Sequence, residues 1–134
     1  MSNPPSSFAE WQDYPLTLDP IHIAWLKNAK KSSTAFAVAD IEGVEISHKK
    51  FLTGVLLFSK KIAVYSPEKN VGLLLPSSGG GAIASMAILA LGKTIVNLNF
   101  TAGKKALQSA AEQAEVKHIY TSRKFLDKMA ERGM

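Results

Sequence analysis

Cysteine is absent from this chain of 134 residues, which excludes disulfides, thiolate metal ligands and a cysteine nucleophile. Arginine is scarce, since Arg123 and Arg132 are the only two among 16 basic residues and the others are lysine. Aromatic residues make up 8% of the chain and do not alternate with the bases, so the stacking surface of a single-strand binder is missing. The net charge of +5 indicates acidic partners in general, and we expect no nucleic-acid partner.

The usual catalytic and metal-binding patterns are missing as well. His22, His48 and His118 are far apart in the sequence, and none has a second histidine or a carboxylate at ligand spacing, so we expect no metal site. No G-x-S-x-G turn is present, which leaves a serine hydrolase without a nucleophile. Residues 92–94 end like a phosphate-binding P-loop, but the first glycine of that motif would have to replace Ala87. We therefore expect no catalytic residue on this chain.

No charged residue occurs from Asn70 to Gly92, a stretch long enough to span a membrane as a helix. A proline, two serines and three glycines at 76–81 interrupt it in the middle. A buried strand, a turn and a buried helix explain the pattern better than a spanning helix. The N-terminus has neither a basic nor an apolar signal region, so we expect a cytoplasmic location for this segment.

The N-terminal part has a different composition from the rest. The first 20 residues contain four of the six prolines and no basic residue, and we interpret residues 1–32 as an arm or linker with a short helix allowed after Pro20. Ser47 is a suitable N-cap for an amphipathic helix, because apolar residues recur at helical spacing from Phe51 to Ile62.

Two short apolar runs, 35–41 and 44–47, predict a β-hairpin, because Glu42-Gly43 between them can form a tight turn. Three carboxylates lie near this turn: Asp40, Glu42 and Glu45. Neighbouring carboxylates can do acid–base chemistry, but a solvated hairpin is the simpler interpretation.

Strands and helices alternate in the second half of the chain. Three apolar runs of strand length lie near 71–75, 94–98 and 117–121, and helices are expected at 79–91, from Thr101 to about 114, and after Ser122. Thr101 and Ser122 are the expected N-caps of the last two helices. Continuous apolar strands alternating with helices favour a three-layer α/β fold with a mostly parallel sheet, to which the N-terminal hairpin and helix are added.

A candidate ligand site follows from this arrangement. Gly79-Gly80-Gly81 follows a strand and begins a helix, which is where phosphate-binding loops lie. The dinucleotide pattern G-x-G-x-x-G fails at Ala84. Ligands of open α/β sheets bind at the carboxyl ends of the strands, so the candidate contacts are Ser77, Ser78, Gly79, Gly80, Asn99 and Thr101. The alternative interpretation is a flexible turn with close packing of helix and strand.

The segment from Asn70 through Leu-Pro-Ser-Ser at 75–78, followed by an alanine-rich helix and residues 91–99, resembles the opening of the adenylate-forming (AMP-dependent) acyl-CoA synthetase superfamily. Members carry a strand ending in Leu-Pro-Asn, a buried helix and an Ala-Gly-x-x-x-x-Pro-Leu-Asn segment. This chain departs from that pattern at Lys93 and Asn97, where alanine and proline are common.

Residues 99–111 and 114–128 are similar to one subgroup, the bifunctional 2-acylglycerophosphoethanolamine acyltransferase/acyl-[acyl-carrier-protein] synthetases. The resemblance covers about residues 33–130 and implies that 33–134 is an N-terminal segment of a larger adenylation domain. The superfamily's nucleotide loop, ribose-binding aspartate and catalytic lysine lie further along the chain than Ser122. The resemblance therefore implies a scaffold segment that is inactive alone and binds no cofactor by itself.

For the parent enzyme, the resemblance implies ATP and Mg²⁺ as cofactors and a fatty acid as the substrate that becomes an acyl-adenylate. Acyl carrier protein, CoA or a lysophospholipid would accept the acyl group, and the remainder of the parent synthetase would be this segment's partner. The resemblance also implies that the parent associates with the inner membrane.

Two alternatives remain open. The chain could be a stand-alone nucleotide- or anion-binding module that uses residues 77–81 and 99–101, or a docking domain whose paired lysines bind an acidic carrier protein. If the parent sheet continues past residue 134, this segment leaves a strand edge uncovered that would pair with another chain, so we expect a dimer or a swapped assembly.

Overall fold

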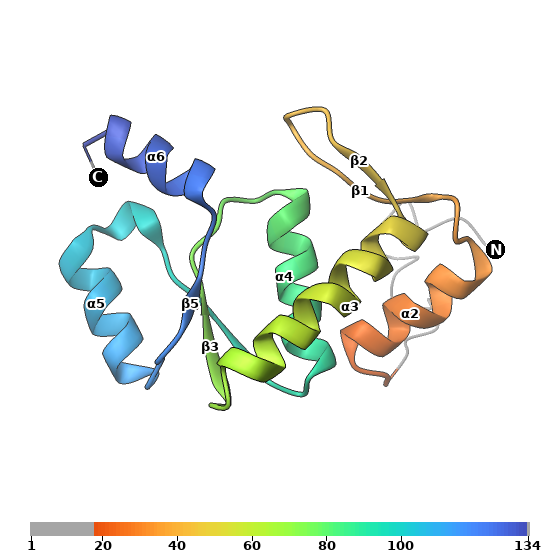
Figure 1. Cartoon of the computed structure of the whole chain (residues 1–134), viewed down its shortest axis with the longest axis horizontal. Coiled ribbons are helices and arrows are strands. Elements are labelled where there is room, and N and C mark those ends of the chain that lie inside the picture. Colours follow the sequence, from red (N-terminus) through yellow and green to blue (C-terminus); the bar gives the residue numbers. More distant parts are fainter. Residues whose placement is uncertain (1–17, 134) are drawn as a thin grey trace, which may run out of the picture.

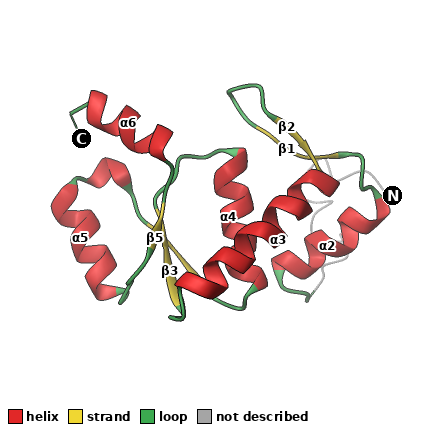
Figure 2. Ribbon diagram, viewed as in Figure 1, coloured by secondary structure: helices red, strands yellow, loops and turns green. Residues whose placement is uncertain are grey.

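A three-stranded parallel sheet forms the centre of the molecule, as the alternating pattern predicts. The computed structural model describes residues 18–133 (Figures 1 and 2). In chain order the elements are α2 (Ile21–Lys31), β1 (Phe36–Ala39), β2 (Glu45–Ser47), α3 (His48–Tyr65), β3 (Asn70–Leu73), α4 (Gly79–Ala90), β4 (Thr94–Asn97), the 3₁₀ turn η1 (Phe100–Ala102), α5 (Lys104–Gln113), β5 (Ile119–Tyr120) and α6 (Arg123–Glu131). The strand order is β4-β3-β5, so β3 lies in the middle.

Helices cover both faces of the sheet, as Figure 1 shows. Successive strand residues point to opposite faces, so Val71 of β3 packs against α3 and α4, whereas Leu74 packs against the layer formed by α5 and α6. On the first face Ile62 and Ile88 are fully buried. Strand β3 is apolar from Val71 to Leu73 because both of its faces are buried.

Strand β5 is much shorter than the five residues expected for it. Only Gly72 and Leu73 of β3 have register partners on it. The chain leaves α5 late, because the Val116 N–H still donates to Ala111 O at 2.9 Å and Glu115 adopts a φ of 52°. These residues close the helix instead of extending the strand.

The hairpin is present, with β1 and β2 antiparallel and Gly43 at a φ of 81° in the turn. Residues 21–31, within the segment interpreted as an arm, form α2. Its Trp25 packs against Phe51 of α3, with the two ring centres 5.0 Å apart, and its indole N–H donates to His48 Nδ1 at 3.1 Å. The remainder of the arm, residues 1–17, lies outside the described part of the chain.

Two of the expected helix caps are confirmed. Ser47 accepts a hydrogen bond from the Lys50 N–H, and Ser122 accepts one from the Phe125 N–H. The prediction that Thr101 caps the next helix is wrong. Asn99 accepts from both the N–H and the hydroxyl of Thr101, and Gly103, at a φ of 85°, separates this turn from α5. Between residues 18 and 133, no helix has both the length and the apolar composition needed to cross a membrane.

Candidate functional site

A cleft of about 770 Å³ opens at the carboxyl end of β3, between the hairpin turn, α3, α4 and α6. Most of its wall is apolar, and the larger apolar side chains are Ile41, Leu57, Phe58, Leu75, Ile83, Phe100, Phe125 and Met129. Its volume lies in the range of roughly 300–1,000 Å³ that is usual for small-molecule sites. The location agrees with the rule that ligands of open α/β sheets bind beyond the carboxyl ends of the strands.

The structure brings part of the predicted site to this cleft. Ser77, Ser78 and Gly80 line it, and Gly79 lies between them at the start of α4. A second cavity of about 430 Å³ on the other side of the same turn is also lined by Ser77 and Ser78. Asn99 and Thr101 line neither cavity, because their polar atoms bond to each other within the η1 turn.

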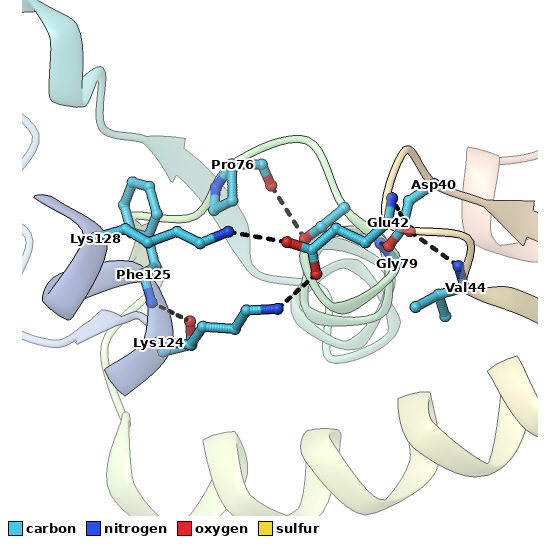
Figure 3. Close-up of polar contacts among 10 residues, drawn as sticks. Asp40, Glu42, Val44, Pro76, Gly79, Lys124, Phe125 and Lys128 are labelled. Carbon is cyan, nitrogen blue, oxygen red and sulfur yellow. Dashed lines mark hydrogen bonds and ion pairs between the residues drawn. The ribbon is translucent and has the colours of Figure 1, made fainter.

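The N-terminus of α4 already has a carboxylate bound to it. The Gly79 N–H donates to Asp40 Oδ2 at 3.2 Å (Figure 3). The Gly81 N–H donates to Ser78 Oγ at 3.1 Å. A phosphate group at a helix N-terminus would need such N–H groups. Asp40, contributed by the hairpin, therefore occupies a place that an anionic ligand would take.

The three glycines of this turn have different surroundings. A Cβ atom on Gly79 would lie 2.9 Å from Ile46 Cδ1, and one on Gly81 would lie 2.9 Å from Pro76 O. At Gly80 the nearest atom would be Ser78 Oγ at 4.0 Å, so this position has space for a side chain. Close packing therefore explains why residues 79 and 81 are glycines, without any role in binding a ligand.

Glu42 at the hairpin turn is the most strongly perturbed carboxylate of the cleft. Lys124 Nζ lies 2.6 Å from one carboxylate oxygen of Glu42 and Lys128 Nζ lies 2.9 Å from the other (Figure 3). Hydrogen bonds from Lys124 and Lys128, together with their positive charges, lower the pKa of Glu42 to about 2. Glu42 therefore stays ionised at neutral pH and links the hairpin to α6 across one side of the cleft.

None of these contacts was predicted from the sequence, where Asp40, Glu42 and Glu45 were interpreted as carboxylates of a solvated hairpin. In the structure Asp40 binds a residue about 40 positions away, and Glu42 binds two lysines more than 80 positions away. The available signal was the spacing of Lys124 and Lys128, because residues four apart on a helix present their side chains on the same face.

A second polar cluster lies at the opposite end of the sheet. His118 Nδ1 is 2.7 Å from Glu68 Oε1, and Lys93 Nζ donates to Glu68 O at 2.7 Å. Burial raises the pKa of Glu68, but hydrogen bonds from its own backbone and from His118 outweigh burial and leave the pKa below its ordinary value. Lys93, a departure from the superfamily pattern, thus ties down the loop before β3. No group of three or more metal-ligating side chains occurs in the described part of the chain.

Solved structures resemble this chain, although no model of a known protein family matches its sequence. A four-domain nonribosomal peptide synthetase, in its holo form with bound AMP and glycine, is 20% identical, with a TM-score of 0.72 over 82% of this chain and 8% of its own. The Klebsiella oxytoca NpsA N-terminal subdomain is 12% identical, with a TM-score of 0.70 over 79% of this chain and 28% of its own.

The same subdomain in complex with 3-hydroxyanthranilyl-AMSN is 13% identical, with a TM-score of 0.69 over 82% of this chain and 31% of its own. The chain thus spans less than a third of each of these three structures. Its residues form part of the fold that the N-terminal subdomain of adenylate-forming enzymes adopts.

Proposed function

We propose that this chain is the first part of the adenylation domain of an acyl-activating enzyme. In that reaction a carboxylate oxygen attacks the α-phosphorus of ATP, the bond to pyrophosphate breaks, and an acyl-adenylate forms. The observation that carries the proposal is the fold, which matches part of a nonribosomal peptide synthetase bound to AMP and glycine with a TM-score of 0.72, and two structures of the Klebsiella oxytoca NpsA N-terminal subdomain with TM-scores of 0.70 and 0.69.

The finer part of the proposal concerns the substrate. We assign a fatty acid as the carboxylate, and acyl carrier protein, CoA or a lysophospholipid as the acceptor. This assignment is supported by the similarity of residues 99–128 to the bifunctional acyltransferase/synthetase subgroup. The matched structures do not bear on it, because one contains AMP and glycine and another contains 3-hydroxyanthranilyl-AMSN.

In this proposal the 134-residue chain is a scaffold without activity of its own. The two carboxylates that line the cleft, Asp40 and Glu42, both have structural partners: a helix N-terminus and two lysines. The residues that would bind ATP and Mg²⁺ belong to the remainder of the parent enzyme. The reading frame that follows Met134 in the source gene is the first thing to determine.

ATP–pyrophosphate exchange tests the proposal in two steps. The 134-residue chain should give no exchange with any acid, whereas the product of the whole reading frame should exchange with long-chain fatty acids. Glycine and an aryl acid serve as competing substrates. Exchange by the short chain alone would refute the scaffold assignment. Exchange by the whole product with glycine or the aryl acid alone would refute the fatty-acid assignment and leave the enzyme class intact.

The alternative of a stand-alone nucleotide-binding module has less support. Asp40 already accepts a hydrogen bond from the Gly79 N–H, and its negative charge would repel a phosphate from the start of α4. Calorimetric titration with ATP or AMP distinguishes the two proposals. Micromolar binding by the short chain that disappears in Gly80→Val would favour the module, because position 80 has space for the new side chain in the folded protein.

A further inference from the structure

The cleft has the shape of a groove between two helices. One wall is formed by Gly54, Leu57 and Lys61 of α3, which are three and four positions apart and therefore lie in one row along that helix. The other wall is formed by residues 124, 125, 128 and 129 of α6 and by Arg132 directly after its end. Ile83 and Ala84 of α4 contribute to the floor.

The α3 wall leaves large apolar side chains uncovered. Leu57 is 65% exposed, and Val64, the next position of the same row after Lys61, is 75% exposed although it does not line the cleft. Exposed apolar side chains thus occur on this row both inside the cavity and beyond it, on either side of Lys61. Exposed apolar side chains bordered by charge are typical of an interaction site. A row longer than the cavity suits an elongated occupant better than a small molecule.

The charge around the groove is positive. Four cationic side chains line it, namely Lys61, Lys124, Lys128 and Arg132, against the carboxylates Asp40 and Glu42. Both carboxylates already have partners within the molecule. Within residues 18–133, Lys61 and Arg132 have no ion-pair partner, and they lie on opposite walls. An occupant with acidic groups along both of its sides would therefore find cations on both walls.

Glu42 shows how a carboxylate fits this groove. A side chain from a segment more than 80 positions away lies between Lys124 and Lys128 and accepts a hydrogen bond from each. Lysines four residues apart on α6 can therefore hold one carboxylate together. An acidic side chain of a docked segment could make the same contact with Lys61 or Arg132, which lie at the rim of the cleft.

We propose that the groove between α3 and α6 docks an acidic amphipathic helix of another polypeptide. The apolar face of that helix would cover Leu57 and Val64, and its acidic flanks would face Lys61 and Arg132. Helices bind in grooves in this way through apolar anchors at i, i+3, i+4 and i+7. Opposite charges at the rim add specificity and speed association. The inference rests on the groove alone and holds whether or not the parent enzyme activates fatty acids.

The experiment uses the full 134-residue chain and fluorescein-labelled helical peptides. The probes are a series with Leu, Ile or Phe at the anchor positions and Glu on both flanks. Two control peptides keep the anchors: one replaces every Glu by Lys, and one scrambles the sequence. Fluorescence anisotropy should show saturable binding of the acidic peptides alone. The Kd should increase when salt is raised, because the Debye length shortens from about 30 Å at 0.01 M to about 8 Å at 0.15 M.

Two matched pairs of variants locate the binding site. Leu57→Ser should weaken binding about tenfold, whereas Leu56→Ser should not, since Leu56 is similarly exposed at 54% but does not line the groove. The double variant Lys61→Glu/Arg132→Glu should abolish binding. Lys104→Glu/Lys105→Glu makes the same change in net charge on α5 and should leave the Kd unchanged. Circular dichroism checks that each variant is folded.

Several outcomes would overturn the proposal. These are the absence of binding by every acidic peptide, equal binding of the Lys-substituted or scrambled peptide, and equal weakening by Leu56→Ser and Leu57→Ser. Light scattering that shows a dimer abolished by Leu57→Ser would identify the occupant as a second copy of the chain. Saturable binding of dodecanoate that is lost in Leu57→Ser, with no binding of any acidic peptide, would identify a small-molecule site instead.

Discussion

The two faces of the sheet are covered very differently. On the face that packs against α3 and α4, Ile62, Val71 and Ile88 are fully buried. On the opposite face the buried cluster consists of Leu74, Leu98 and Phe125, each 4–8% exposed, and α5 has no buried residue at all. The first layer is thus a closed core, whereas the second is thin and is held by a few apolar contacts and by ion pairs.

This difference follows from the helix sequences. Residues 79–90 of α4 are apolar on nearly every side, because the helix contacts the sheet on one side and α3 on another. Residues 104–113 of α5 are largely polar or alanine, and Leu107 and Ala111 provide its contact with the core. The layer of α3 and α4 is therefore well packed by contacts within this segment. The layer of α5 and α6 can gain stability from further residues that pack against it.

Truncating one residue from each layer tests this comparison most strongly. Ile88→Ala should cost about 2–5 kcal/mol of unfolding free energy, because it leaves a cavity in a fully buried site. Leu107→Ala in the partly buried α5 should cost less than about 2 kcal/mol. Urea unfolding followed by circular dichroism measures both. If Ile88→Ala does not fold, Ile88→Val should still cost about 0.5–1.5 kcal/mol. Equal losses of unfolding free energy at the two positions would show that α5 contributes as much to the core as α4 does.

Two glycines sharpen the comparison at the level of single contacts. Gly72→Ala places a methyl group 2.8 Å from Val116 Cγ1 and 2.9 Å from Ile119 Cγ1, so it should displace β5 and cost about 1–3 kcal/mol. Gly80→Ala is the matched control, because its Cβ meets nothing closer than 4.0 Å. It lies in the first turn of α4 and should stabilise the protein by up to about 1 kcal/mol. Thermal unfolding of both variants checks the signs, and destabilisation by Gly80→Ala would contradict the open space at that position.

Asp40 connects the hairpin to the well-packed layer. Its carboxylate accepts from the N–H groups of Glu42, Val44 and Gly79 at 3.0–3.2 Å. Asp40→Ala should cost about 0.5–2 kcal/mol, as the loss of a capping carboxylate usually does. Hydrogen exchange should become faster at the Val44 and Gly79 amides in particular. Glu45→Ala is the control, and equally fast exchange in that variant would mean that the hairpin is not held through Asp40.

Much of the fold could be predicted because it is encoded locally. Apolar runs of strand length, a serine before each of two helices and Gly43 in the turn are signals that neighbouring residues carry by themselves. The lengths of the elements were harder to predict. β5 has two residues instead of five, and the turn that follows α5 still binds the Val116 N–H to Ala111 O; that competition between two elements is invisible in the apolar run.

The candidate site could be located only in part. Serine and glycine at residues 77–80 were recognised because a turn between strand and helix has a known place at the sheet edge. The partners of that turn come from distant segments, since Asp40 reaches Gly79 and Glu42 reaches α6. Such contacts depend on how the hairpin packs against the helices, and no pattern within a short window of sequence specifies them.

The smallest expected effect concerns Glu42, which links the hairpin to the thin layer through α6. Its pKa is lowered from 4.5 to about 2 in the folded protein, so its ionised form stabilises the fold. That contribution is complete above pH 4.5 and is lost as the pH falls towards 2. Wild type should therefore be slightly more stable than Glu42→Gln at neutral pH, and urea midpoints should converge as the pH falls to about 2. High salt should reduce the difference in urea midpoint between wild type and Glu42→Gln, because Glu42 and both lysines are exposed to solvent. Glu45→Gln is the control for the loss of a hairpin carboxylate. A difference in urea midpoint between wild type and Glu42→Gln that does not change with pH would show that the two lysines do not hold Glu42 in solution.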